Sequence, residues 1–187
     1  MSGDSYEVPP LSRSKIRATA RKVRDLVQLL SGPHDAGGYF DIVRFLDIQM
    51  PEASPEFALE VVSEAQMREL HGDAHAITIP TNDLIQVRED IWERAVEGEG
   101  RDRFTLAHEL GHYVLHARPG FARRRADGRT PPYRQSEWQA NALAGELLVP
   151  ALMAGTCSGP APAAQVFGVS LDAAQVQWKV FKKDRIV

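Results

Sequence analysis

Cysteine is nearly absent from this sequence, since Cys157 is the single one among 187 residues. One thiol cannot form a disulfide within the chain, so we expect a protein that folds in a reducing compartment. Long apolar runs are missing too, and none approaches the roughly 18 residues that a membrane-spanning helix needs. Residues 1–10 (MSGDSYEVPP) show no basic stretch followed by an apolar one, as a secretory signal would. We therefore expect a soluble, cytoplasmic protein without a membrane partner.

The sequence also lacks a strong excess of charge of one sign. Its formal net charge of -3 predicts no general attraction to nucleic acid, and we expect no direct nucleic-acid binding. Hydrophobic residues make up 43% and charged residues 25%, which is typical of a globular protein. A chain of 187 residues is long enough for one domain with a buried core.

Hydrophobic periodicity predicts an α+β fold that is mainly helical. Ser12 is the expected N-cap of a first helix that reaches Leu30, and a short helix around 40–46 should stop before Pro51. Three β-branched segments, separated by turn-forming residues, predict a small sheet that we expect to be antiparallel. These segments are FALEVVS (57–63), AHAITIP (74–80) and LIQVRE (84–89). Further helices are expected at 91–98, 103–116 and 136–148.

The chain divides into a flexible tail (1–11), one domain (12–150) and a C-terminal helical segment (151–187) packed on that domain. A flexible linker, GTCSGPAPA (155–163), should lie inside the last part. The stretch AQVFGVSLDAAQVQWKV (164–180) has the cadence of a helix-turn-helix. Its second helix contains few basic residues, so we interpret it as a packing helix pair.

The pattern H-E-x-x-H occurs at His108–His112, inside the apolar stretch FTLAHELGHYVLH (104–116). Two imidazoles four residues apart on a helix lie on one face and can bind the same ion. Glu109 lies beside that ion, where its carboxylate can deprotonate a water molecule. The alternative, core histidines satisfied by hydrogen bonds, leaves a buried Glu109 without a partner. The pattern therefore predicts a catalytic metal site.

A catalytic zinc ion usually has three protein ligands, so one is still missing. His116 lies about 12 Å along the helix axis from His108, too far to share an ion with it. We interpret His116 as a helix-end residue or a packing contact. Glu137 is the favoured third ligand, and Glu146 on the same expected helix is its rival.

Other candidate residues surround this set. Asn141 follows Glu137 by four residues and can hydrogen-bond a ligand imidazole. Donors for a developing oxyanion could come from Tyr113, Tyr133 or the arginines of the 118–135 loop, and the sequence leaves this choice open. The loop is either a mobile, solvated segment or an exosite for an acidic part of the substrate, formed by Arg123, Arg124 and Arg125.

Two blocks of the sequence, RDRFTLAHELGHYVLH (101–116) and EWQANALAGELLVP (137–150), together resemble the ImmA/IrrE family of bacterial metallo-endopeptidases. The second block is similar to that family's E-x-x-A-N-x-x-A-x-E-L-L-x-P pattern. The resemblance implies a zincin-like core of the gluzincin type and one Zn²⁺ ion. It implies that His108, His112 and Glu137 are the ligands and that Glu109 is the general base.

The resemblance further implies a zinc-dependent endopeptidase that cleaves a helix-turn-helix transcriptional repressor and so relieves repression. No recognisable helix-turn-helix precedes the metal motif, so we expect this regulator to be encoded separately. The alternative is a non-proteolytic metal-binding regulatory or antitoxin-like protein that acts by binding a partner. Glu109 favours the enzyme, because a pure binder needs no general base. The ligand types do not exclude Mn or Fe.

Overall fold

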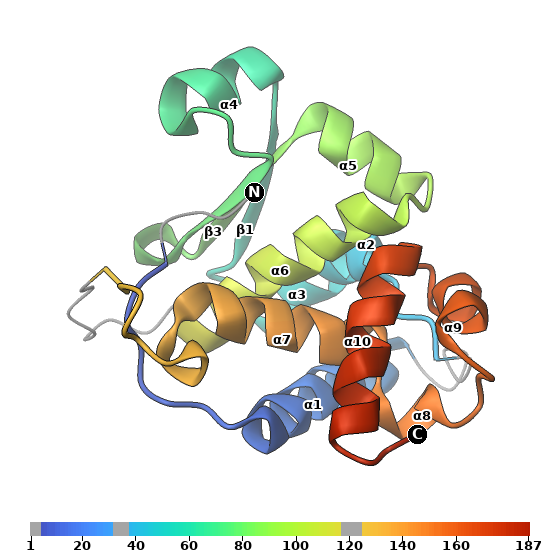
Figure 1. The fold of residues 1–187 in the computed structure, drawn as a ribbon. Helices are drawn as coiled ribbons and strands as arrows, with labels where there is room; N and C mark the ends of the chain where they lie inside the picture. The colour runs from blue at the N-terminus through green and yellow to red at the C-terminus, as the bar shows by residue number, and fades with distance from the viewer. Residues whose placement is uncertain (1–4, 32–37, 117–124) are drawn as a thin grey trace.

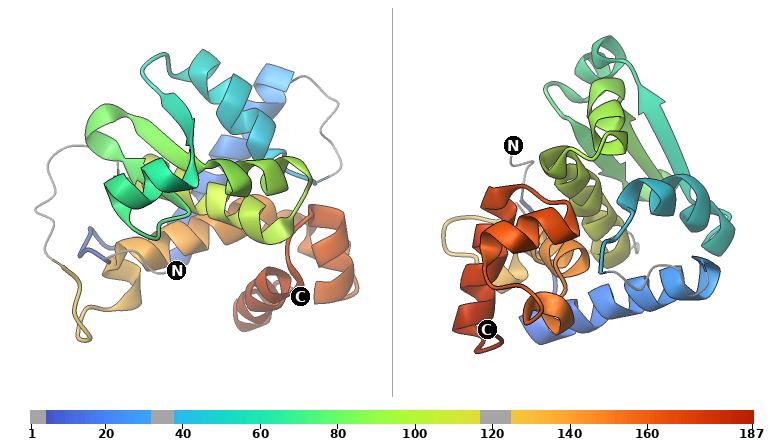
Figure 2. Two further views of the ribbon diagram at one scale, coloured as in Figure 1. Left: turned by 90° about the horizontal axis from the view of Figure 1, so that it is seen from above. Right: turned by 90° about the vertical axis from the view of Figure 1, so that its right-hand side faces the viewer.

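Two long helices, α6 (Gly100–His116) and α7 (Ser136–Leu148), lie side by side at the centre of the protein (Figure 1). The computed structural model describes residues 5–31, 38–116 and 125–187. The other helices are α1 (Arg13–Ser31), α2 (Ile42–Arg44), α3 (Met50–Ala53), α4 (Glu64–His71), α5 (Glu89–Val96), α8 (Ala151–Ala154), α9 (Pro160–Phe167) and α10 (Leu171–Lys183). The sheet, α4 and α5 lie on one side of α6. Helix α7 packs on the other side, with α1 and α10 against it (Figure 2).

Helix α1 forms as the sequence predicts. The Ser12 hydroxyl accepts a hydrogen bond from the Lys15 backbone N–H at 3.3 Å, which is the expected N-cap. Ile16, Ala20 and Val27 are buried along one face of the helix, and α1 packs against α7 through this face.

The helix expected to stop before Pro51 instead continues through it. A π-helical turn, η2 (Phe45–Gln49), connects α2 to α3, and the Met50 N–H bonds to the Phe45 carbonyl. Pro51 lies in the first turn of α3, where its missing N–H costs little. The predicted break at Pro51 is therefore wrong.

The three predicted strands are present, but the sheet is mixed rather than antiparallel. Its order is β1 (Ala58–Val62), β3 (Leu84–Arg88), β2 (Ala76–Ile79), with β3 parallel to β1 and antiparallel to β2. A short turn through η3 (Pro80–Asn82) joins β2 to β3 and makes that pair antiparallel. Helix α4, which the sequence reading missed, lengthens the connection after β1, so that β3 can insert between the other two strands. Strand β2 is consequently an edge of the sheet.

The first helix of the C-terminal pair, α9, begins earlier than expected. Pro160 is in the first turn of α9, so helix replaces part of the linker predicted at 155–163. Gly168 ends α9 with a φ of +60°, a left-handed conformation that suits glycine. The Ser170 hydroxyl then caps α10 by accepting from the Ala173 N–H at 3.2 Å. The helices α9 and α10 form the packed pair that we expected.

The end of the predicted N-terminal tail is in contact with the rest of the protein. Tyr6 and Glu7 form isolated β-bridges with Arg125 and Gln135, respectively. Val8 is buried, and its N–H donates to the Arg134 carbonyl at 2.8 Å. Residues 5–8 thus lie directly beside the start of α7. The domain boundaries themselves remain a prediction.

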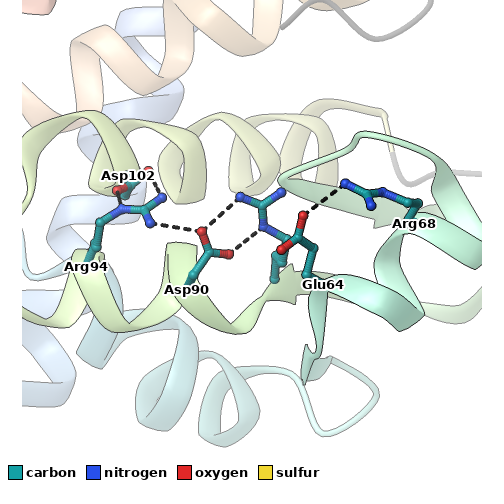
Figure 3. A network of polar contacts seen from close by, with 6 residues as sticks. Glu64, Arg68, Asp90, Arg94 and Asp102 are labelled. Atoms are coloured by element: carbon teal, nitrogen blue, oxygen red, sulfur yellow. Dashed lines mark hydrogen bonds and ion pairs between the residues drawn. The ribbon is translucent and has the colours of Figure 1, made fainter.

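Two polar anchors fix the first turns of α6. Asp102 accepts a hydrogen bond from Arg94 of α5 at 2.6 Å, and Arg94 also donates to Asp90 at 2.9 Å (Figure 3). Arg103 is 1% exposed, and its guanidinium donates to the carbonyls of Phe40 (2.6 Å), Phe167 (3.2 Å) and Gly168. These contacts hold α6 between α5 and the C-terminal helices, and so position the H-E-x-x-H residues one turn later.

Among the described residues, we find no helix that combines the length and the apolar character needed to cross a membrane.

Candidate metal centre

Helix α6 brings the imidazoles of His108 and His112 together. The spacing of four residues places both side chains on one face, with 3.0 Å between the two Nε2 atoms. The ring centroids are 4.7 Å apart. The two Nε2 atoms therefore face the same point in space, as the sequence pattern predicts.

Helix α7 adds Glu137 to this pair. Glu137 Oε1 lies 3.0 Å from His112 Nε2, and Oε2 lies 3.3 Å from His108 Nε2. Within the described part of the chain, these three side chains form the cluster of potential ligands whose donor atoms lie within 4.8 Å of one another. The sequence favoured Glu137 over Glu146, and the structure places Glu137 at the cluster.

Glu146 lies elsewhere and has a different partner. Its side chain is completely buried and accepts two hydrogen bonds from Arg17 of α1, at 2.9 and 2.8 Å. Arg17 also pairs with Asp184 at 3.0 Å. Glu146 therefore links α7 to α1 and to the end of α10, and it does not reach the histidines.

The approach of α7 to α6 depends on Gly111. A Cβ atom at Gly111 would lie 2.9 Å from the Ala140 carbonyl oxygen and 3.0 Å from the Ala140 Cα. Real Cβ atoms keep larger distances from backbone, so a larger residue would push the helices apart. The glycine within H-E-x-x-H therefore lets a carboxylate on α7 reach histidines on α6.

The three donors fit a transition-metal ion. Two imidazole nitrogens and one carboxylate oxygen are a usual ligand set for catalytic zinc. Bonds of about 2.0–2.1 Å in a tetrahedral arrangement separate neighbouring donors by about 3.3 Å. The separations here are 3.0, 3.0 and 3.3 Å, so small side-chain adjustments suffice to hold an ion.

The electrostatics of the cluster favour an anionic carboxylate. Burial by itself would raise the pKa of Glu137, but hydrogen bonds from His108 and His112 outweigh it and lower this pKa to about 2. Burial acts to lower the pKa of His108, but the hydrogen bond to Glu137 and the charge of Glu109 outweigh it and raise this pKa. Glu137 is thus ionised at neutral pH, as a metal ligand must be.

Glu109 lies beside the cluster and is held by the edge strand. Its Oε2 accepts a hydrogen bond from the Thr78 hydroxyl of β2, and the same hydroxyl is 2.8 Å from the Glu109 carbonyl oxygen. Thr78 thus fixes the carboxylate that the sequence assigns as general base. The sequence analysis missed Thr78, because β2 gives no local signal that it packs against α6.

Asn141 makes the contact expected of it. Its Oδ1 lies 3.1 Å from His108 Nδ1, so the amide can accept the imidazole N–H while Nε2 faces the cluster. The effect of this contact on metal binding remains a prediction.

A cleft of about 1370 Å³ surrounds the cluster. His108, Glu109, His112 and Glu137 all line it. Other lining residues come from further positions of α6 and α7, the N-terminal segment at 6–8, the β2 region at 74–78, and α10 at 172–177. The candidate metal centre is therefore open to a large ligand.

Neither tyrosine proposed as an oxyanion donor is among the residues that line the cleft. The ring of Tyr113 packs against Phe57 at 5.1 Å between centroids, on a different face of α6. Tyr133 is half-exposed and lines a separate pocket with Trp138. Arg125 pairs with Tyr6 through the backbone, and Arg123 and Arg124 lie outside the described residues. The oxyanion donor and the exosite therefore stay predictions.

Comparison with known proteins agrees with this geometry. No curated protein matches the chain. Residues 65–179, more than half of the chain, match a peptidase family described as the IrrE N-terminal-like domain. The matched range runs from α4 to α10 and contains His108, Glu109, His112 and Glu137. The resemblance expected from the two sequence blocks is thereby confirmed, and the chain belongs to the IrrE N-terminal-like family of peptidases.

Proposed function

We propose that this protein is a zinc-dependent endopeptidase that cleaves a separately encoded transcriptional regulator of the helix-turn-helix class. The observation that carries the proposal is the triangle of His108, His112 and Glu137 donors, with Glu109 beside it at the wall of an open cleft. Membership of a peptidase family supports the peptidase activity. Zinc is the usual metal for two histidines and one carboxylate.

The cleft suits an extended peptide. Strand β2 is at the edge of the sheet, and the residues at 74–78 line the cleft. The backbone groups on such an edge can pair with a substrate strand. A peptide bound in this way passes the carboxylate of Glu109, which Thr78 of the same strand holds.

The residues divide the chemistry among them. His108, His112 and Glu137 would hold the ion, which when bound supplies Lewis-acid activation of a carbonyl oxygen and of water. Glu109 accepts a proton from the attacking water and then donates it to the nitrogen of the leaving amine. Thr78 orients Glu109 for both transfers, and Asn141 orients His108.

The test is a cleavage assay with the purified protein and the helix-turn-helix regulator encoded nearest to its gene. We expect cleavage that requires zinc, stops with a chelator and resumes when zinc is restored. Glu109→Gln should keep metal binding and lower the cleavage rate by about 10²-fold or more, which is the usual contribution of a general base. Glu52→Gln, a change at an exposed glutamate of α3, is the matched control and should cleave at the normal rate.

Full cleavage by a zinc-loaded Glu109→Gln protein would refute the mechanism. Binding of the regulator without any cleavage would refute the proposed function and favour the partner-binding alternative. Cleavage of general peptides with no action on regulators would leave a peptidase and refute the proposed substrate.

A further inference from the structure

His116 lies one turn after His112 on α6. It is not one of the three potential ligands, but it contacts the ligand His112 on the side away from the cluster. His112 uses Nε2 to face Glu137 and His108, while its Nδ1 lies 3.2 Å from Nδ1 of His116. The second nitrogen of His116, Nε2, lies 3.1 Å from Oε1 of Gln139. A chain of side chains therefore leads from the candidate metal centre into α7.

Gln139 ends this chain, and its orientation is determined by its surroundings. The side chain is buried, at 1% exposure. Its Nε2 lies 2.8 Å from the Pro9 carbonyl oxygen and 2.8 Å from the Tyr133 carbonyl oxygen. Carbonyl oxygens only accept hydrogen bonds, so the NH₂ group must face them. The amide oxygen of Gln139 must then face His116.

This orientation determines where each proton lies along the chain. Because Oε1 of Gln139 accepts, Nε2 of His116 must carry the hydrogen. Neutral imidazole has one N–H, so Nδ1 of His116 offers a lone pair and accepts from Nδ1–H of His112. When an ion is bound, His112 would then offer the lone pair of Nε2 to it, on the side that faces the ligand cluster.

We propose that His116 and Gln139 are positioning residues that hold His112 in the tautomer and ring orientation needed to bind a metal through Nε2. The chain ends on two backbone carbonyls, which fix the orientation of its last side chain, Gln139. The proposal rests on the proposed metal site and adds a role for two residues outside the proposed ligand set. Partners of this kind typically change metal affinity by about 10–100-fold when they are removed.

The two ligand histidines thus differ in their support. His108 relies on Asn141, which is exposed and whose place water can take. His112 relies on His116, which the buried Gln139 holds, and loss of the acceptor at His116 leaves the N–H of His112 without its partner.

The first test compares two substitutions of His116 in the full-length protein. Asn at this position keeps an oxygen near the place of Nδ1 and can still accept from His112, whereas Leu fills space but accepts nothing. We expect His116→Leu to weaken zinc binding by about 10–100-fold and His116→Asn by less than about 5-fold, as measured by competition with a chromophoric chelator. A simple packing role predicts the reverse order, because Leu replaces the lost volume better. Equal affinities, or the reverse order, would overturn the proposal.

The second test needs no substitution, so it holds even if the Leu variant fails to fold. Imidazole ¹⁵N chemical shifts in the zinc-loaded protein report the tautomer of each histidine. We expect Nδ1–H for His112 and Nε2–H for His116, and Nδ1–H on His116 would overturn the proposal. Both measurements are independent of cleavage, so an inactive protein that passes them refutes only the proposed function. An active protein that fails them refutes only this inference.

Discussion

Replacing Gly111 with alanine tests whether the spacing between α6 and α7 controls the metal centre. The added Cβ would lie 2.9 Å from the Ala140 carbonyl oxygen. Optimal separations for such contacts are about 3.5–4.0 Å, so the helices must separate by roughly 0.5–1 Å. Glu137 precedes Ala140 by three residues on α7 and must move with it. The perturbation therefore acts on the third ligand without changing any donor.

The expected magnitudes follow from two opposing effects on stability. Alanine in a helix is favoured over glycine by about 1 kcal/mol, while overpacking a well-packed core costs about 1–3 kcal/mol. The net loss should be about 1 kcal/mol, or about 2–4 °C in Tm for a chain of this size. Metal sites tolerate displacements of only about 0.2 Å per bond. We therefore expect the zinc affinity to fall by at least about tenfold. The loss of metal binding should affect function more than the loss of fold stability does.

Gly145→Ala is the matched control. Gly145 is also a buried helical glycine, but the Cβ there would meet the Oε1 end of the Gln177 side chain at 2.7 Å. A flexible side chain can move away where a backbone carbonyl cannot, so zinc affinity should stay within about twofold. Both variants are assayed by chelator competition and by thermal unfolding without metal. Wild-type zinc affinity in Gly111→Ala would refute the reasoning.

Two further substitutions separate the metal centre from the contacts that support the fold. Glu146→Gln should lower stability by about 1–2 kcal/mol, because a neutral amide replaces the carboxylate that Arg17 binds while Arg17 keeps Asp184 as a partner, yet zinc affinity should be unchanged. Loss of zinc binding in that variant would contradict the assignment of Glu137 as the ligand. Asp90→Asn tests the pH dependence of stability: the hydrogen bond from Arg88 holds the pKa of Asp90 well below its usual value, with a further contribution from Arg94. A lowered pKa in the folded state stabilises the protein above the unfolded-state pKa of about 3.9, and this contribution is lost as the pH falls below that value. Urea unfolding of metal-free protein should therefore show a deficit for Asp90→Asn at pH 6–7 that shrinks below about pH 4, and a deficit that is independent of pH would contradict this origin.

Local patterns in the sequence were sufficient for the parts of the protein that depend on near neighbours. A spacing of four residues on a helix dictates that His108 and His112 share a face, whatever the helix packs against. Helix α1, α5 and the three strands were predicted for the same reason, since periodicity and turn residues act over a few positions. Glu137 was favoured over Glu146 because it shares a helix face with Asn141, and in the structure Glu137 lies beside His108 and His112.

Relations between distant segments were decided only by the tertiary structure. The mixed sheet depends on β3 inserting between β1 and β2, and single-strand patterns carry no information about the order of strands. Thr78 reaches Glu109, and Gln139 reaches His116, because α6 lies between the sheet and α7. The sequence argued against His116 as a ligand but could not assign it a role, since its partner Gln139 lies 23 residues further along the chain. The ligand pair follows from the pitch of one helix, and everything that orients it follows from packing.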